Sequence, residues 1–177
     1  MTSQQTSSQQ TAMGATRRQV GAMTVTLVSD TEIVLEREID APRELVFLAH
    51  SSCEHMRHWW GRRVDSMPSC EIDFREGGAW RMVNRDDKGN EFVFFGEYIL
   101  IREPERIDWT FGFEGMEGEP GPESLTLEAL DGGRRTLLRS RAVLPSREAL
   151  DAMIATGMEQ GAAETWDRLA EYVATLT

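Results

Sequence analysis

The chain has 177 residues, of which 40% are hydrophobic and 28% charged, an ordinary balance for a globular protein with one sizeable core. Its formal net charge of -11 argues against nucleic acid and anionic membranes as partners, because phosphate binding needs clustered Lys and Arg. No apolar run approaches the roughly 20 residues that span a bilayer. The first residues lack the basic and apolar regions of a secretory signal, so we expect a cytoplasmic protein.

Two cysteines are too few for a disulfide framework. We expect Cys53 and Cys70 to be reduced thiols, with a single bridge between them as the alternative. Cys53, His55 and His58 are a local group of metal-type ligands, but positions i and i+2 of a helix point apart. We therefore expect neither a metal site nor a cofactor.

The first 29 residues are rich in Ser, Thr and Gln and contain almost no aromatic residues. Such a composition cannot bury enough apolar surface to order the chain. We expect residues 1–29 to form a disordered tail and residues 30–177 to form one folded domain.

The folded part begins with alternating apolar residues at 31–39, which predict a half-buried strand. Asp40, Ala41 and Pro42 then resemble a helix start, and we expect short helices over 42–50 and 53–60. Six further strands are separated by turn-forming residues. We place them at residues 70–75, 79–84, 91–101, 106–113, 125–129 and 135–144, with a loop of Gly, Pro and Glu over 115–122.

The last 30 or so residues carry apolar side chains every three or four positions, which predicts one long amphipathic helix. Gly157 and Gly161 lie four residues apart on this helix and suggest either a close approach to a sheet or a slight bend. An antiparallel sheet of about seven strands that buries one face against a single helix is an α+β arrangement.

Several short motifs, in this order, resemble the SRPBCC (START-like, helix-grip) superfamily, in the branch homologous to the activator of heat shock protein 90 ATPase. The motifs are REIDAPRELVF at 37–47, WWG at 59–61, IDFREGGAW at 72–80, FGEY at 95–98, PERI at 104–107, GMEQG at 157–161 and DRLAEY at 167–172. The resemblance implies a helix-grip fold with a curved sheet around the C-terminal helix. It also implies an elongated cavity for an apolar or amphipathic small molecule, without fixing one activity. Relatives include lipid carriers, polyketide cyclases, resistance proteins and co-chaperones.

The strand phases place large apolar side chains on the face that the C-terminal helix would cover, where they could line a cavity or fill a closed core. Trp60 is ambiguous, because it adjoins Trp59 and neighbouring residues of a helix cannot share a face. The expected apolar walls are Trp60, Trp80, Met82, Phe94, Tyr98, Trp109, Phe111, Met158 and Trp166.

Two polar residues at inward positions are candidate anchors for a ligand. Arg37 lies on the apolar side of the first strand and needs a partner, which could be a ligand carboxylate or an internal acid. Asn84 could orient a ligand or lie at a strand end.

We expect a protein that holds a hydrophobic or aromatic small molecule in an internal cavity, with a homodimer possible. One alternative is a cyclase or hydrolase acting on a polyketide-like substrate in the same cavity. Such an enzyme would need an inward carboxylate or histidine with a shifted pKa, and no residue is a clear candidate. A second alternative is a regulator of a heat shock protein ATPase.

Overall fold

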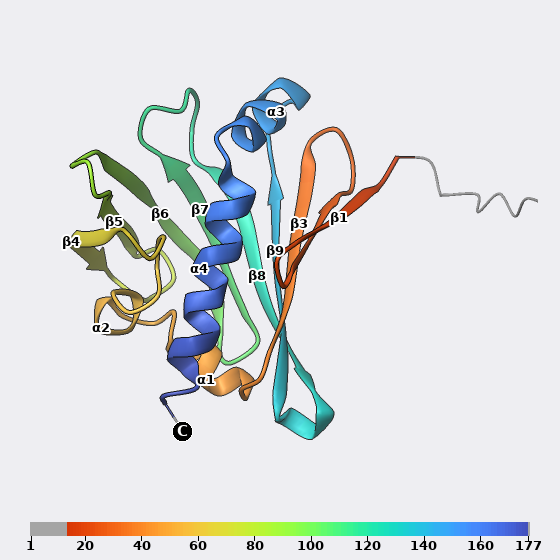
Figure 1. Ribbon diagram of the computed structural model, residues 1–177, viewed down its shortest axis with the longest axis vertical. Coiled ribbons are helices and arrows are strands. Elements are labelled where there is room, and N and C mark those ends of the chain that lie inside the picture. Colours follow the sequence, from red (N-terminus) through yellow and green to blue (C-terminus); the bar gives the residue numbers. More distant parts are fainter. Residues whose placement is uncertain (1–13, 177) are drawn as a thin grey trace, which may run out of the picture.

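The computed structural model describes residues 14–176, in which nine strands form one antiparallel sheet and helix α4 lies across one face of it (Figure 1). We call the face that α4 covers the inner face. The strands are β1 (Thr16–Val20), β2 (Met23–Leu27), β3 (Glu32–Ile39), β4 (Ser66–Ile72), β5 (Ala79–Arg85), β6 (Glu91–Arg102), β7 (Arg106–Phe113), β8 (Gly121–Leu130) and β9 (Arg135–Val143). The helices are α1 (Arg43–Leu48), α2 (Cys53–Met56), η1 (Asp131–Gly133), α3 (Arg147–Ala155) and α4 (Met158–Val173).

The strand order is β1-β2-β3-β9-β8-β7-β6-β5-β4, so most strands pair with their neighbour in the sequence. The exception is the pairing of β3 with β9, which runs from Glu32 opposite Val143 to Ile39 opposite Thr136. This pairing joins an N-terminal meander to a C-terminal one. The α+β class and the helix-grip arrangement expected from the sequence are confirmed.

The sheet has two more strands than the expected seven or so, because β1 and β2 form a hairpin within the segment that we expected to be a disordered tail. That expectation is wrong for residues 16–27, while residues 1–13 lie outside the described part. The alternation of β2 explains the difference. Met23 and Val25 are fully buried, and Val25 pairs with Leu35 of β3, so a short strand gains an apolar face from its neighbour.

The expected single C-terminal helix is two helices, α3 and α4, separated at Gly157. Gly157 has a φ of 80° and its N–H donates to the carbonyl of Ile154 at 3.1 Å, as in a left-handed helix end. Gly161 lies inside α4, and a side chain added there would meet no atom within 4 Å. Gly157 therefore marks a helix break, and neither glycine marks a close approach to the sheet.

Two local expectations also change. Helix α2 ends at Met56, so Trp59 and Trp60 lie in the loop after it and are not bound by the spacing of a helix. In β6 a register shift between Tyr98 and Leu100 brings Ile101 and not Leu100 into the core. A bulge of this kind reverses which alternate side chains face inward.

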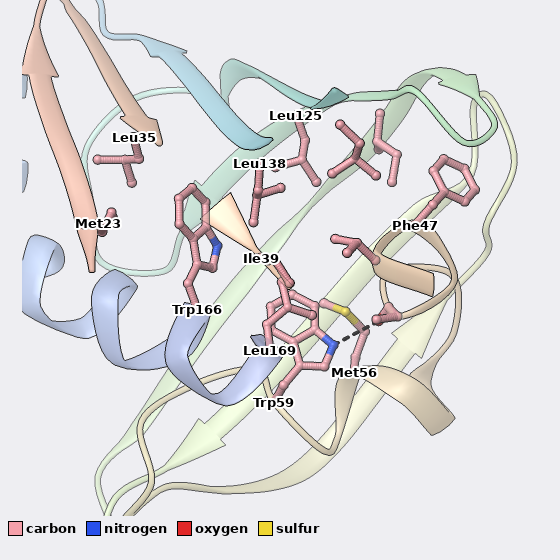
Figure 2. Packing of buried hydrophobic residues seen from close by; sticks show 14 of the residues in the cluster. Met23, Leu35, Ile39, Phe47, Met56, Trp59, Leu125, Leu138, Trp166 and Leu169 are labelled. Atoms are coloured by element: carbon pink, nitrogen blue, oxygen red, sulfur yellow. Dashed lines mark hydrogen bonds between the residues drawn. The ribbon is translucent and has the colours of Figure 1, made fainter. Parts of the chain in front are cut away.

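A fully buried group of side chains lies where α1, the loop after α2 and α4 meet β3 and β9 (Figure 2). We call this region the packed core, and its central side chains are Ile39, Met56, Trp59, Leu138 and Leu169, all at most 1% exposed. The indole N–H of Trp59 donates to the carbonyl of Ala49 at 2.9 Å (Figure 2). Apolar contact and a satisfied polar atom together stabilise this end of the molecule.

Candidate functional site

A second group of large side chains lies on the inner face of β5, β6 and β7. We call it the aromatic cluster, and its members are Trp60, Trp80, Phe94, Trp109 and Phe111. The ring centroids of Trp80 and Trp109 are 5.2 Å apart, and those of Trp80 and Phe111 are 5.3 Å apart. Trp60 meets Phe94 edge to face at 5.6 Å. The cluster brings together five of the eleven residues proposed from the sequence.

The strand register places these rings, and one glycine makes room for them. Trp80 lies opposite Gly96 on β6. A Cβ at Gly96 would come within 1.8 Å of the carbonyl oxygen of Thr110 and 2.9 Å of Trp80 Nε1. No side chain fits there, so the Trp80 indole can lie against the backbone of β6.

Trp60 reaches the cluster from the loop after α2, and Arg168 of α4 holds that loop. Arg168 Nη1 donates to the carbonyl oxygens of Trp60, Gly61 and Arg62 at 3.2, 2.9 and 3.0 Å. Burial, with Arg63 nearby, lowers the pKa of Arg168 from its usual high value. A guanidinium that caps three carbonyls fixes the backbone on which Trp60 is carried.

The cluster is only partly enclosed. Trp80 and Trp109 are 2% and 3% exposed, whereas Trp60, Phe94 and Phe111 are half-buried. The backbone of α4 approaches those of α1, α3, β1 and β2 most closely and lies farther from those of β5–β7. Met158, at the start of α4, is half-buried and belongs to the same hydrophobic layer.

Buried polar atoms near the cluster lack partners. Among residues 14–176, Trp80 Nε1, Trp109 Nε1 and Asn84 Oδ1 are buried without a hydrogen bond. A buried donor or acceptor left unpaired costs about 1–3 kcal/mol. Buried polar groups are normally hydrogen-bonded, so each of these three atoms needs a partner from outside the described residues, such as a ligand group or a water molecule.

Asn84 is tied to the loop that carries Trp60. Its Nδ2 donates weakly to the Trp60 carbonyl at 3.5 Å, and a Cβ on Gly61 would come within 2.0 Å of the same nitrogen. Asn84 therefore lies against the loop and leaves its amide oxygen unpaired within residues 14–176.

Four other proposed residues have packing roles. Met82 and Tyr98 are each 1% exposed, and Tyr98 packs edge to face on Phe74 at 5.1 Å, where burial raises its pKa. Trp166 packs near Met23 and Leu35 on the other side of the inner face (Figure 2). Arg37 on β3 forms an ion pair with Asp167 of α4, so its partner is an acid of the chain itself, although the Asp167 side chain is 44% exposed and not internal.

The arginine lies in a surface groove of about 340 Å³ between β3 and α4, apart from the aromatic cluster. A larger hollow of about 670 Å³ lies on the outer face, with Arg81, Val93, Phe95, Glu97 and Thr110 among its lining residues. Most of these alternate with the cluster residues along β5 and β6, so they face away from α4.

The cysteines differ from the expectation of reduced thiols, because Cys53 of α2 and Cys70 of β4 form a disulfide. Their Cα atoms are 5.8 Å apart, since α2 lies against β4. The expected cytoplasmic location rested in part on reduced cysteines. The disulfide removes that support, because disulfides persist in oxidising compartments. The disulfide also uses Cys53, one of the three possible metal ligands at 53–58. The other two contact Tyr172: His55 Nδ1 forms a hydrogen bond with the Tyr172 hydroxyl at 2.7 Å, and the His58 ring stacks on the Tyr172 ring.

Glu123 of β8 is an inner-face residue that was not among the predicted site residues. It lies between the predicted loop at 115–122 and the predicted strand at 125–129, although it continues the alternation of Leu125 and Leu127. Burial raises the pKa of the Glu123 carboxyl, and hydrogen bonding from Ser140 opposes the rise only in part. Continuing the alternation of Leu127 and Leu125 back to position 123 would have predicted an inward-facing side chain there.

Comparison with known proteins agrees with this architecture. A protein from Rhodobacter sphaeroides is 24% identical, with a TM-score of 0.79 over 87% of this chain and 99% of that one. The AHSA1 protein from Silicibacter pomeroyi is 20% identical, with a TM-score of 0.66 over 82% and 99% of the two chains. CalU16 from Micromonospora echinospora is 19% identical, with a TM-score of 0.55 over 90% and 83%.

No curated protein matches the sequence. None of the helices in the described part of the chain is long and apolar enough to cross a membrane. The family model described as "Activator of Hsp90 ATPase homolog 1-like protein" matches residues 40–174, which is most of the chain and includes strands β4–β9 and all the helices described above. The chain therefore belongs to the Activator of Hsp90 ATPase homolog 1-like family, within the SRPBCC superfamily.

Proposed function

We propose that this protein binds a hydrophobic or aromatic small molecule on the inner face of the sheet, between the aromatic cluster and α4. The observation that carries the proposal is the pairing of half-buried aromatic rings with unpartnered polar atoms. Trp60, Phe94 and Phe111 remain partly exposed beside the buried, unpaired N–H groups of Trp80 and Trp109 within the described chain. Binding sites for small molecules combine apolar walls with a few polar groups in this way.

The packing of the remaining inner face supports the same location. The region around Trp59 has a satisfied N–H and side chains at most 1% exposed, so it offers no surface to a ligand. The aromatic cluster instead lies where the α4 backbone is farther from the sheet. Aromatic faces and edges attract other aromatic molecules through offset and edge-to-face contacts, which favours a planar ligand.

The first test is native mass spectrometry of the purified protein, followed by denaturing extraction of any bound compound. We expect an apolar small molecule to be released, or, from empty protein, binding of the fluorescent probe 1-anilinonaphthalene-8-sulfonate. The variant Phe111→Ala should weaken probe binding, and Phe47→Ala, which alters the inner face beside α1, should not. An empty protein that also fails to bind the probe would contradict the proposal and return attention to a protein partner.

A further inference from the structure

The outer face of the sheet carries a hollow on the opposite side from the site proposed above. This outer hollow has a volume of about 670 Å³ and is lined mainly by residues of β5, β6 and the loop between β7 and β8. Sites for small molecules have volumes of roughly 300–1,000 Å³. The outer hollow is therefore large enough for a ligand of its own.

The floor of the outer hollow is apolar and is shaped by a glycine. Val93, Phe95 and Pro120 line it with half-buried side chains. Phe95 lies opposite Gly112 of β7, where an added Cβ would come within 2.7 Å of Phe95 Cζ and 3.0 Å of Pro120 Cγ. The ring can therefore lie against the backbone of β7, beside the proline, and still keep part of its surface open. A half-buried aromatic ring of this kind offers its face or edge to a ligand.

The rim of the outer hollow is acidic. Its exposed carboxylates are Glu71 of β4, Glu97 of β6, and Glu114 and Glu119 of the loop after β7. Arg81 of β5 is the single cation among the described residues that line it, and its Nη2 lies 3.9 Å from a Glu114 oxygen. Within residues 14–176, the other three carboxylates form no ion pair. An apolar floor is thus combined with an excess of negative charge.

Over β3, β7 and β9, by contrast, carboxylates of the outer face are balanced by arginines. Glu36 of β3 forms an ion pair with Arg139 of β9 at 2.8 Å, and Asp108 of β7 forms one with Arg106 at 2.7 Å. Around the outer hollow, four carboxylates face one guanidinium. A cationic ligand group would supply the missing counter-charge, and complementary charge of this kind favours one class of ligand over another.

We propose that the outer hollow binds a small organic cation that carries an apolar or aromatic group. The apolar group covers Val93 and Phe95, and the cationic head lies among the carboxylates of the rim. An alkylated ammonium suits this place, because cations are attracted to the face of an aromatic ring and such a head has no N–H that needs an acceptor. The ligand differs in charge from the neutral molecule proposed for the inner face, so the two sites are separate.

The test titrates the full-length protein with benzyltrimethylammonium and with phenylmethanesulfonate, which share a phenyl ring and have tetrahedral heads of opposite charge. Amide NMR spectra locate the binding. The cation should shift the signals of Phe95 and Glu97 and leave the Trp109 indole N–H on the inner face nearly unchanged, and the anion should shift none of them. Raising NaCl from about 20 to about 500 mM should weaken cation binding several-fold, because salt screens exposed charges.

Charge variants separate a site from general attraction to an acidic protein. Glu97→Gln/Glu119→Gln removes two rim carboxylates and should weaken cation binding about fivefold. Glu128→Gln/Glu148→Gln removes two exposed carboxylates outside the hollow and should change it less than about twofold. Phe95→Leu keeps an apolar floor without the ring and should weaken binding about threefold.

Three results would overturn the outer site. They are equal affinities for the cation and the anion, equal weakening by the two double variants, and shifts confined to the inner face. Binding of tetralysine without binding of benzyltrimethylammonium would point to a basic protein segment and would also overturn it. None of these results bears on the neutral ligand proposed for the inner face.

Discussion

Trp59 and Trp109 are equally inaccessible to water, but they belong to different kinds of interior. The Trp59 N–H donates to the carbonyl of Ala49, and the residue is 1% exposed. Trp109 is 3% exposed, yet its N–H completes no hydrogen bond among residues 14–176, and its ring contacts the half-buried Phe111 as well as the buried Trp80 and Tyr98. Burial alone therefore does not distinguish a core from a binding surface. The two are distinguished by whether their buried polar atoms are hydrogen-bonded within the protein.

The comparison is tested most strongly by truncating the two adjacent tryptophans. Trp59→Ala removes a fully buried ring and should lower the free energy of unfolding by about 3–5 kcal/mol. Trp60→Ala removes a half-buried ring and should cost less than about 2 kcal/mol, while it weakens binding of an aromatic probe. Urea denaturation and probe titration measure the two effects. Equal losses of stability would show that the packed core and the aromatic cluster are one continuous core.

The disulfide between Cys53 and Cys70 ties α2 to the edge strand β4, and so restrains the loop that carries Trp60. Its ends are 17 residues apart, and closing such a loop in the unfolded chain is worth about 3 kcal/mol. We expect dithiothreitol to lower the free energy of unfolding by this amount, with no effect on the double variant Cys53→Ser/Cys70→Ser. Two titratable thiols in the native, unreduced protein would instead support the reduced cysteines expected from the sequence.

His50 gives the packed core a dependence on pH. Its ring contacts Trp59, and its Nδ1 lies 2.7 Å from the Val46 carbonyl. Burial lowers the pKa of His50 from 6.5 to about 4. Because the unfolded chain binds the proton more readily, stability is greatest above pH 6.5 and is lost as the pH falls toward 4. The loss between pH 7 and pH 5 should be about 2 kcal/mol.

Denaturation of wild type and His50→Gln at these two pH values measures that difference. Carboxylates titrate mostly below this range, so the variant should keep nearly constant stability from pH 7 to pH 5. An equal loss in both proteins would mean that His50 is not the group responsible. Probe affinity at the aromatic cluster should change little, because the His50 ring packs on Trp59 of the packed core and Trp59 separates it from Trp60.

Periodic patterns predicted most of the fold. Alternation along β3, β7 and β9 and the apolar stripe of α4 fixed the class, because each extends over at least two turns or four alternations. Short elements were harder. The hairpin at 16–27 was hidden by the polar composition around it, and its strand β2 becomes buried only by pairing with β3. Bulges and helix breaks, as at Tyr98 and Gly157, depend on single residues and therefore cannot be predicted from the periodicity of apolar residues.

The candidate site was predictable only in its aromatic part. Inward positions of Trp80, Trp109 and Phe111 follow from the period of two. The unpartnered N–H groups could not be foreseen, because hydrogen bonding depends on which atoms strand pairing brings close. Proximity of the two cysteines likewise depends on how α2 lies against β4.

The strand order also constrains how the chain reaches its native state. All the pairings except that of β3 with β9 join strands that follow one another along the described chain, so each can form as a local hairpin. Joining β3 to β9 brings together residues about a hundred positions apart, as Glu36 and Arg139 are, with a separation of 103. Closing that loop carries the main entropic cost, so it is expected to limit the folding rate. On the ribosome, the sheet can be completed only after β9 has emerged from the exit tunnel.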